Sequence, residues 1–134
     1  MRILVDANVI VSALAFPGSV PARALDQIMR DHTVVVSDLI LREVERVLDV
    51  KFPQVLPLWR ALLTEDRFER VPVPEDAVAP AILRDPKDVH VLLASLQPGI
   101  DGLLTGDQDF NTPQLRQVLR VWSPAAMLLE ISDD

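Results

Sequence analysis

The chain has 134 residues, 49% of them hydrophobic, which suits one domain with its own core and is too small for two ordinary domains. Its formal net charge of -7, from 13 Lys and Arg against 20 Asp and Glu residues, argues against a protein that holds nucleic acid by bulk positive charge alone. With no cysteine and 4% aromatic residues, disulfides, thiolate zinc sites and cysteine nucleophiles are excluded, and base stacking is not expected as the main means of binding single strands.

The N-terminal region is predicted to start with a strand at Ile3–Val5, which Asp6 follows directly. That charge interrupts the apolar run too early for a secretory signal peptide. The longest uncharged stretch, residues 7–22, contains an asparagine, two prolines and a glycine, so it does not form the apolar helix of about 20 residues that crosses a bilayer. We therefore expect a soluble, cytoplasmic protein with no membrane partner.

Short apolar segments alternate with helical segments along the rest of the chain. Further strands are predicted at 34–36, 103–105 and 119–122, with a weaker, half-buried edge strand at 68–73. Helices are predicted at 38–50, 86–96 and 124–130, with a short turn after Thr112, and the capping residues are Ser37, Asp85, Thr112 and Ser123. Apolar strands that alternate with helices are typical of a parallel sheet covered on both faces. The sequence predicts a three-layer α/β fold of about five strands in a single domain over residues 1–134.

Acidic residues follow two of these strands. Asp6 comes after the first strand, and Asp107 and Asp109 come after the strand at 103–105. Because ligands of open parallel sheets bind beyond the carboxyl ends of the strands, both sets of carboxylates are expected at one edge. Each set also has a structural explanation, since Asp6 can cap a helix and Asp107 and Asp109 can form a turn. Their shared edge favours a functional site.

The start of helix 86–96 is acidic as well. Asp85 is a typical N-cap, Pro86 suits the first helical position, and the helix dipole favours Asp88 in the first turn. These features are sufficient to explain a well-capped helix. A helix start can also place a carboxylate in the crevice at the sheet edge, so both interpretations stay open and the role of Asp85 is undecided.

Helix 38–50 carries two glutamates, Glu43 and Glu45, on opposite borders of its apolar stripe. Periodicity does not choose between them, and each can be a solvated residue in a local ion pair. The two histidines, His32 and His90, lack metal-binding spacing and are expected to be ordinary loop and helix residues, although His90 can approach the acidic edge. The apolar segment 9–16 is expected to be buried core rather than dimer surface.

Together these motifs resemble the PIN-domain family of metal-dependent ribonucleases, and in particular its VapC-like branch, the toxin components of toxin–antitoxin pairs. The similar segments cover nearly the whole chain: the hydrophobic-DxN start at 3–8, the helix at 37–48, Asp85–Asp88, Leu104–Phe110 and the close at 121–128. One departure is Ser123, where the family usually has threonine. The resemblance implies a Rossmann-like α/β/α sandwich, RNA as the substrate, an antitoxin protein as a partner, and a homodimer.

The resemblance also implies roles for individual residues. It selects Glu43 over Glu45, because the family's glutamate precedes a Val-Leu pair by four and five positions. The implied catalytic and metal-binding acids are Asp6, Glu43, Asp88 and Asp107, with Asp109 as a further metal ligand and Asn8 and Thr105 orienting ligands by hydrogen bonds. Oxygen ligands without cysteine suit Mg²⁺ or Mn²⁺. The implied reaction is endonucleolytic RNA cleavage that leaves a 3′-hydroxyl and a 5′-phosphate.

Candidate phosphate-binding residues are arginines, which suit bidentate contacts to phosphate. The candidates are Arg23, Arg30, Arg42, Arg46 and Arg84. A position on an exposed helix face explains these arginines better than a contact with RNA does. Two bound divalent ions would offset +4 of the -7 and leave about -3, so we expect the protein to bind RNA only with its metals.

Two other functions remain open. A phosphatase resembling the haloacid dehalogenase superfamily also has an aspartate after the first strand, but it usually has a second one two positions on, where this chain has Asn8. The other alternative is a PIN scaffold that binds RNA or protein without cutting. A complete set of mutually repelling acids argues against that scaffold.

Overall fold

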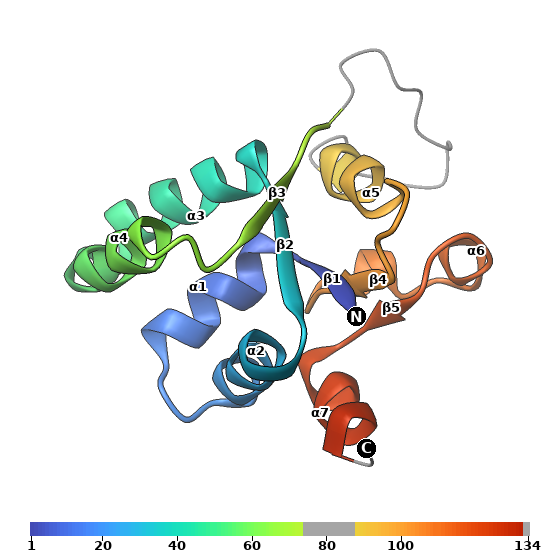
Figure 1. Cartoon of the computed structure of the whole chain (residues 1–134), viewed down its shortest axis with the longest axis horizontal. Helices are drawn as coiled ribbons and strands as arrows, with labels where there is room; N and C mark the ends of the chain where they lie inside the picture. Colours follow the sequence, from blue (N-terminus) through green and yellow to red (C-terminus); the bar gives the residue numbers. More distant parts are fainter. Residues whose placement is uncertain (74–87, 133–134) are drawn as a thin grey trace.

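The computed structural model describes residues 1–73 and 88–132 and contains a five-stranded sheet of order β3-β2-β1-β4-β5 (Figure 1). The strands are β1 (Arg2–Val5), β2 (Thr33–Ser37), β3 (Glu69–Val71), β4 (Gly102–Leu104) and β5 (Val121–Trp122). Every neighbouring pair in the sheet is parallel. The predicted parallel sheet is therefore confirmed, and the weak segment at 68–73 is indeed an edge strand.

Helices cover both faces of the sheet. They are α1 (Ala7–Ala15), α2 (Val20–Asp31), α3 (Asp38–Lys51), α4 (Leu56–Thr64), α5 (Val89–Ser95), α6 (Pro113–Arg116) and α7 (Pro124–Ser132), with 3-10 turns η1 (Pro53–Val55) and η3 (Gln108–Phe110). In Figure 1, α1 to α4 lie on one side of the sheet and α5 and α6 on the other. Right-handed crossovers explain this, because the chain moves outward from β1 to β3 and then returns past β1 to β4. The three-layer α/β architecture is confirmed.

Three of the four predicted helix caps are confirmed, and the fourth is not tested. The backbone N–H groups of three helices donate to capping hydroxyls: Ile40 to Ser37 at 3.2 Å, Leu115 to Thr112 at 3.3 Å, and Ala126 to Ser123 at 3.1 Å. The predicted cap Asp85, with Arg84 and Pro86, lies outside the described residues. These hydroxyls satisfy donors that have no partner within their own helix, which sets each helix start.

The strand bounds differ from prediction by one or two residues: β1 and β2 are longer than expected, β3 and β5 are shorter, and β4 is shifted. The strand expected at 103–105 lies one residue earlier, and the one expected at 119–122 is reduced to Val121–Trp122. The reason for the second difference is local, because the Leu119 N–H still donates to the Leu115 carbonyl at 2.9 Å in the turn that ends α6. Backbone committed to that turn is not available to the sheet.

The core lies between the central strands and the helices on them. Residues 3–5 of β1 and 34–36 of β2 are buried, as a sheet covered on both faces requires. In α1, Val9 to Val11 and Ala13 are buried, so the expectation of core for this segment is confirmed there, but Phe16 is 55% exposed. Among the described residues, no helix is long and apolar enough to cross a membrane.

The strand order reverses between β1 and β4, since the chain leaves β1 toward β2 and later returns to its other side. The register pairs Val5 with Leu104, the last residues of the two strands. The next residues, Asp6 and Thr105, therefore emerge side by side at the carboxyl edge. Open α/β sheets bind ligands at such a reversal.

Candidate functional site

Asp6 occupies the centre of this edge. Its side chain accepts hydrogen bonds from the Ala7 N–H at 2.8 Å and from the Thr105 hydroxyl at 2.7 Å, and the residue is 7% exposed. Asp6 is therefore the N-cap of α1, as the structural interpretation of this residue predicted. It also accepts a hydrogen bond from Thr105, which follows β4. The two interpretations of Asp6 are compatible.

Asn8 and Thr105 join the ends of β1 and β4. The Asn8 amide donates to Asp6 Oδ2 at 3.4 Å, and its oxygen accepts from the Gly106 N–H at 3.3 Å. The Thr105 hydroxyl, while donating to Asp6, accepts from the Asp107 N–H at 3.0 Å. These hydrogen bonds fix the position of the Asp6 side chain relative to the backbone of Asp107.

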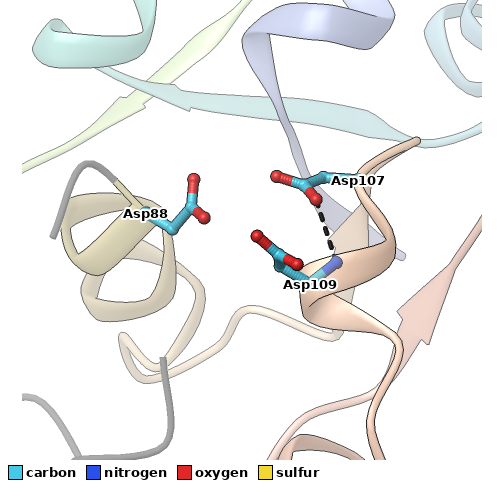
Figure 2. A group of neighbouring side chains, drawn as sticks. All are labelled: Asp88, Asp107 and Asp109. Carbon is cyan, nitrogen blue, oxygen red and sulfur yellow. Dashed lines mark hydrogen bonds between the residues drawn. The ribbon is translucent and has the colours of Figure 1, made fainter. Parts of the chain in front are cut away.

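Three further carboxylates meet beside this network. Asp88, Asp107 and Asp109 each offer an oxygen, and those oxygens all lie within 4.8 Å of one another. Figure 2 shows the Asp88 carboxylate, just before α5, facing those of Asp107 and Asp109 in the segment after β4. Asp107 is also the N-cap of η3 and accepts from the Asp109 N–H at 2.9 Å, so the predicted turn exists as well. Like charges this close repel one another, and an oxygen-binding cation fits the donor set.

The electrostatics of Asp6 link it to the other acids. Burial raises the pKa of the Asp6 carboxyl from 3.8 to about 6, although its hydrogen bonds from Thr105 and Ala7 act in the opposite direction. The charges of Glu43 and Asp107 contribute smaller parts of the same rise in pKa. Asp6 therefore lies within the electrostatic influence of both acids, and a bound cation would reverse the sign of its surroundings.

The structure distinguishes the two glutamates that periodicity left equivalent. Glu43, in the second turn of α3, is half-buried and acts on Asp6, whereas Glu45 pairs with Arg60 at 3.0 Å. The Glu45 side chain thus serves an ion pair between α3 and α4. Glu43 is the glutamate at the acidic edge.

His90 also belongs to the surroundings of this edge. Burial lowers the pKa of its half-buried ring, and the nearby Glu43 carboxylate partly opposes that change. The sequence favoured an ordinary helix position for His90 and gave no spacing signal for this proximity. His32, by contrast, contacts the Met1 ammonium at 2.8 Å at the other end of β1, as an ordinary loop residue does.

None of the candidate arginines that the structure describes forms an ion pair with Asp6, Glu43, Asp107 or Asp109. Arg30 pairs with Asp26 at 3.0 Å within α2, and Arg84 lies outside the described residues. Arg23, Arg42 and Arg46 are exposed on helix surfaces. This agrees with the simpler explanation of solvated helix faces.

A groove beside the acids was not anticipated. It has a volume of about 320 Å³ and lies between α1 and α3, and its lining includes Asn8, Ser12 and Phe16 on one side and Glu43, Val47 and Lys51 on the other. Each set has the spacing i, i+4, i+8, which marks one face of a helix. That spacing was present in the sequence, but only the packing of the two helices shows that the faces meet.

Comparisons with known proteins agree with this geometry. A family model described as the PIN domain matches residues 2–109, which include all the candidate acids. No curated protein matches the sequence. The fold is similar to that of a chain in a structure titled "Crystal structure of VapBC2 from Rickettsia felis bound to a DNA fragment from their promoter", with 13% identity, a TM-score of 0.64, and coverage of 92% of this chain and 98% of that chain. At that identity the likeness concerns the fold.

Proposed function

The chain belongs to the PIN-domain family, and from this premise we propose that it is a metal-dependent endoribonuclease. The observation that carries the proposal is the meeting of Asp88, Asp107 and Asp109 beside the buried Asp6. A protein that uses these acids only for stability would have little reason to keep them together, because they repel one another.

We assign the catalytic and metal-binding roles to Asp6, Glu43, Asp88 and Asp107, with Asp109 as a further ligand. All the donors are carboxylate oxygens, which suits Mg²⁺ or Mn²⁺ and does not suit a thiolate-binding metal. When bound, such an ion supplies Lewis-acid stabilisation of negative charge and lowers the pKa of water. The reaction adds one water across a phosphodiester bond and leaves a 3′-hydroxyl and a 5′-phosphate.

Asn8 and Thr105 are proposed to position Asp6. Both donate to its Oδ2, so they favour the ionised form that a cation requires. The Thr105 hydroxyl also accepts a hydrogen bond from the Asp107 N–H at 3.0 Å, so one side chain aligns two of the acids. Such orienting partners affect metal affinity or activity by about 10- to 100-fold when they are removed.

A toxin role with an antitoxin partner is the biological part of the proposal. It is supported by the VapC-like motifs and by the fold shared with VapBC2, which was crystallised with a fragment of promoter DNA. With this role we propose a homodimer acting on cellular RNA in the cytoplasm. A small open reading frame next to the gene, whose product copurifies with this chain and inhibits cleavage, is the expected finding.

The decisive experiment is RNA cleavage by the purified protein with Mg²⁺ or Mn²⁺. We expect cleavage by the wild type and its loss in folded Asp6→Ala and Asp107→Ala variants. Asp49→Ala, which removes an exposed carboxylate of α3, is the matched control and should cut as the wild type does. Equal residual activity in all variants would point to a contaminating nuclease and overturn the assignment.

Two further measurements separate the alternatives. Calorimetric titration with Mn²⁺ should show binding to the wild type and weaker binding to Asp107→Ala, whereas no binding to either would favour a non-catalytic scaffold. Turnover of a simple phosphate monoester in place of RNA would favour the phosphatase. The Asn8 amide argues against a phosphatase, since it bridges Asp6 and Gly106 and cannot serve as the usual acid or base.

A further inference from the structure

We propose that the groove between α1 and α3 is a nucleotide subsite. It would bind one nucleotide of the RNA strand beside the scissile phosphate, with the base against Phe16 and a phosphate of the strand near Lys51. This inference rests on the proposed nuclease function and names how that site holds its substrate.

The groove is continuous with the acidic edge. Asn8 and Glu43 line it, and the same two residues contact or influence Asp6. Both helices begin at the carboxyl edge of the sheet, where Asp6 caps α1 and Ser37 caps α3. Figure 1 shows α1 and α3 side by side on one face of the sheet. From Glu43 to Lys51 the groove follows eight residues of helix, about 12 Å at about 1.5 Å per residue.

The walls of the groove suit a nucleobase. Its volume is about 320 Å³, and apolar side chains form most of the lining surface, with Asn8, Ser12, Glu43 and Lys51 as the polar or charged groups. That is the size and composition typical of small-ligand sites. At the end away from the acids, Phe16 is 55% exposed and meets Phe52 edge to face, with centroids 5.6 Å apart and ring planes at 81°. An exposed aromatic face of this kind binds bases of any identity by stacking.

The charges favour a nucleic acid strand over an apolar peptide. Lys51 lies at the far end of the groove, and no ion pair involving it occurs within residues 1–73 and 88–132. Lysine is scarce in this acidic chain, and the other one, Lys87, lies outside those residues. A strand whose scissile phosphate meets the metal end and which places another phosphate, farther along the strand, at Lys51 uses both ends of the groove. An apolar peptide would use only the middle.

The test measures steady-state cleavage of a short single-stranded RNA with Mn²⁺. Phe16→Ala should raise KM about tenfold, more than it lowers kcat, because the loss of base stacking weakens binding by roughly 5- to 150-fold. Phe16→Tyr should restore the wild-type KM. Lys51→Gln should raise KM and reduce the salt dependence of binding by about 0.7 in log–log slope, as the loss of one phosphate contact requires.

Matched controls come from exposed residues outside the groove. Val50→Ala, next to Lys51 on α3 and 72% exposed, and Leu129→Ala, on α7 and 71% exposed, should leave KM within about twofold of wild type. A direct readout uses RNA that contains a photoreactive 5-bromouridine. Its cross-link should map to Phe16 or Phe52 in the wild-type protein, so the proposal stays testable even where a variant fails to fold.

The outcomes separate this inference from the proposed function. Wild-type cleavage together with unchanged KM in Phe16→Ala and Lys51→Gln, or cross-links only outside the groove, would overturn the subsite and leave the nuclease intact. In that case a protein segment becomes the better occupant. If the wild type cuts no RNA with either metal, the proposed function fails and the subsite fails with it.

Discussion

Charged groups are arranged differently at the amino and carboxyl edges of the sheet. At the amino edge several charged groups meet partners: the Arg2 guanidinium pairs with Glu69, the Arg2 N–H donates to Asp101 at 2.7 Å, and the Met1 ammonium contacts His32. At the carboxyl edge Asp88, Asp107 and Asp109 meet each other, and buried Asp6 faces Glu43 and Asp107. The amino edge is therefore arranged for stability, whereas the carboxyl edge brings like charges together, an arrangement that suits a bound cation.

The pKa directions express the same contrast. Arg2 lowers the pKa of Glu69, so at neutral pH the ionised form of Glu69 favours the folded state. Burial and neighbouring acids raise the pKa of Asp6 to about 6, so its ionised form disfavours the folded state. Functional sites commonly reduce stability in this way, and four substitutions test the contrast.

The largest expected effect separates two neighbouring glutamates. Glu43→Gln should lower metal-dependent RNA cleavage by about 100-fold or more, because it removes a carboxylate from the acidic edge. Glu45→Gln should leave cleavage within about twofold and cost about 1 kcal/mol of stability or less, because it breaks only a surface ion pair with Arg60. Cleavage rates and denaturation midpoints check both. Similar losses of activity in the two variants would show that the acidic edge is not what distinguishes them.

The second largest expected effect is a gain in folding stability when the charge of Asp6, at the carboxyl edge, is removed. For Asp6 the folded pKa of about 6 exceeds the ordinary 3.8, which at about 1.4 kcal/mol per pH unit is a penalty of about 3 kcal/mol on the folded state above pH 6. Asp6→Asn removes that charge, so without metal it should stabilise the protein at pH 8 by about 1–3 kcal/mol while abolishing cleavage.

The pH dependence supplies the control for this variant. The penalty is absent when Asp6 is protonated in both states, so the gain should shrink as pH falls from 6 and vanish below about pH 4. Urea denaturation at pH 8 and pH 4, with chelator present, measures it. A variant less stable than the wild type at pH 8 would mean that the hydrogen bonds from Thr105 and Ala7 outweigh the burial of the charge.

The smallest effect should have the opposite sign and lies at the amino edge. Because the folded pKa of Glu69 is lowered, its ionised form contributes stability above the ordinary pKa, and this contribution is lost as pH falls through the folded pKa. Glu69→Gln should therefore slightly destabilise the protein at pH 7 and leave cleavage unchanged. The loss should be smaller than the gain in Asp6→Asn, because both partners are about a third or more exposed. A matching gain in both variants would remove the contrast between the edges.

Local patterns predicted much of this architecture, because strand composition and helix caps act over a few residues. The pattern that predicted β1 ends at Asp6, and the capping serines and threonines mark helix starts that the structure has. The order of acids along the chain, read through the family resemblance, also predicted the set that includes Asp88 and Asp107. No spacing pattern in the sequence predicts that His90 lies near Glu43, because the two residues lie on different helices.

By itself the sequence determined the α/β class, the carboxylates at strand ends and the absence of any cysteine that could supply a sulfur ligand. Only the tertiary structure decided that Asp88 reaches Asp107, that Glu45 turns to Arg60 instead of the acids, and that α1 and α3 enclose a groove. The physical reason is range: periodicity and capping are local, whereas these contacts depend on strand register and on the crossover that brings β4 beside β1.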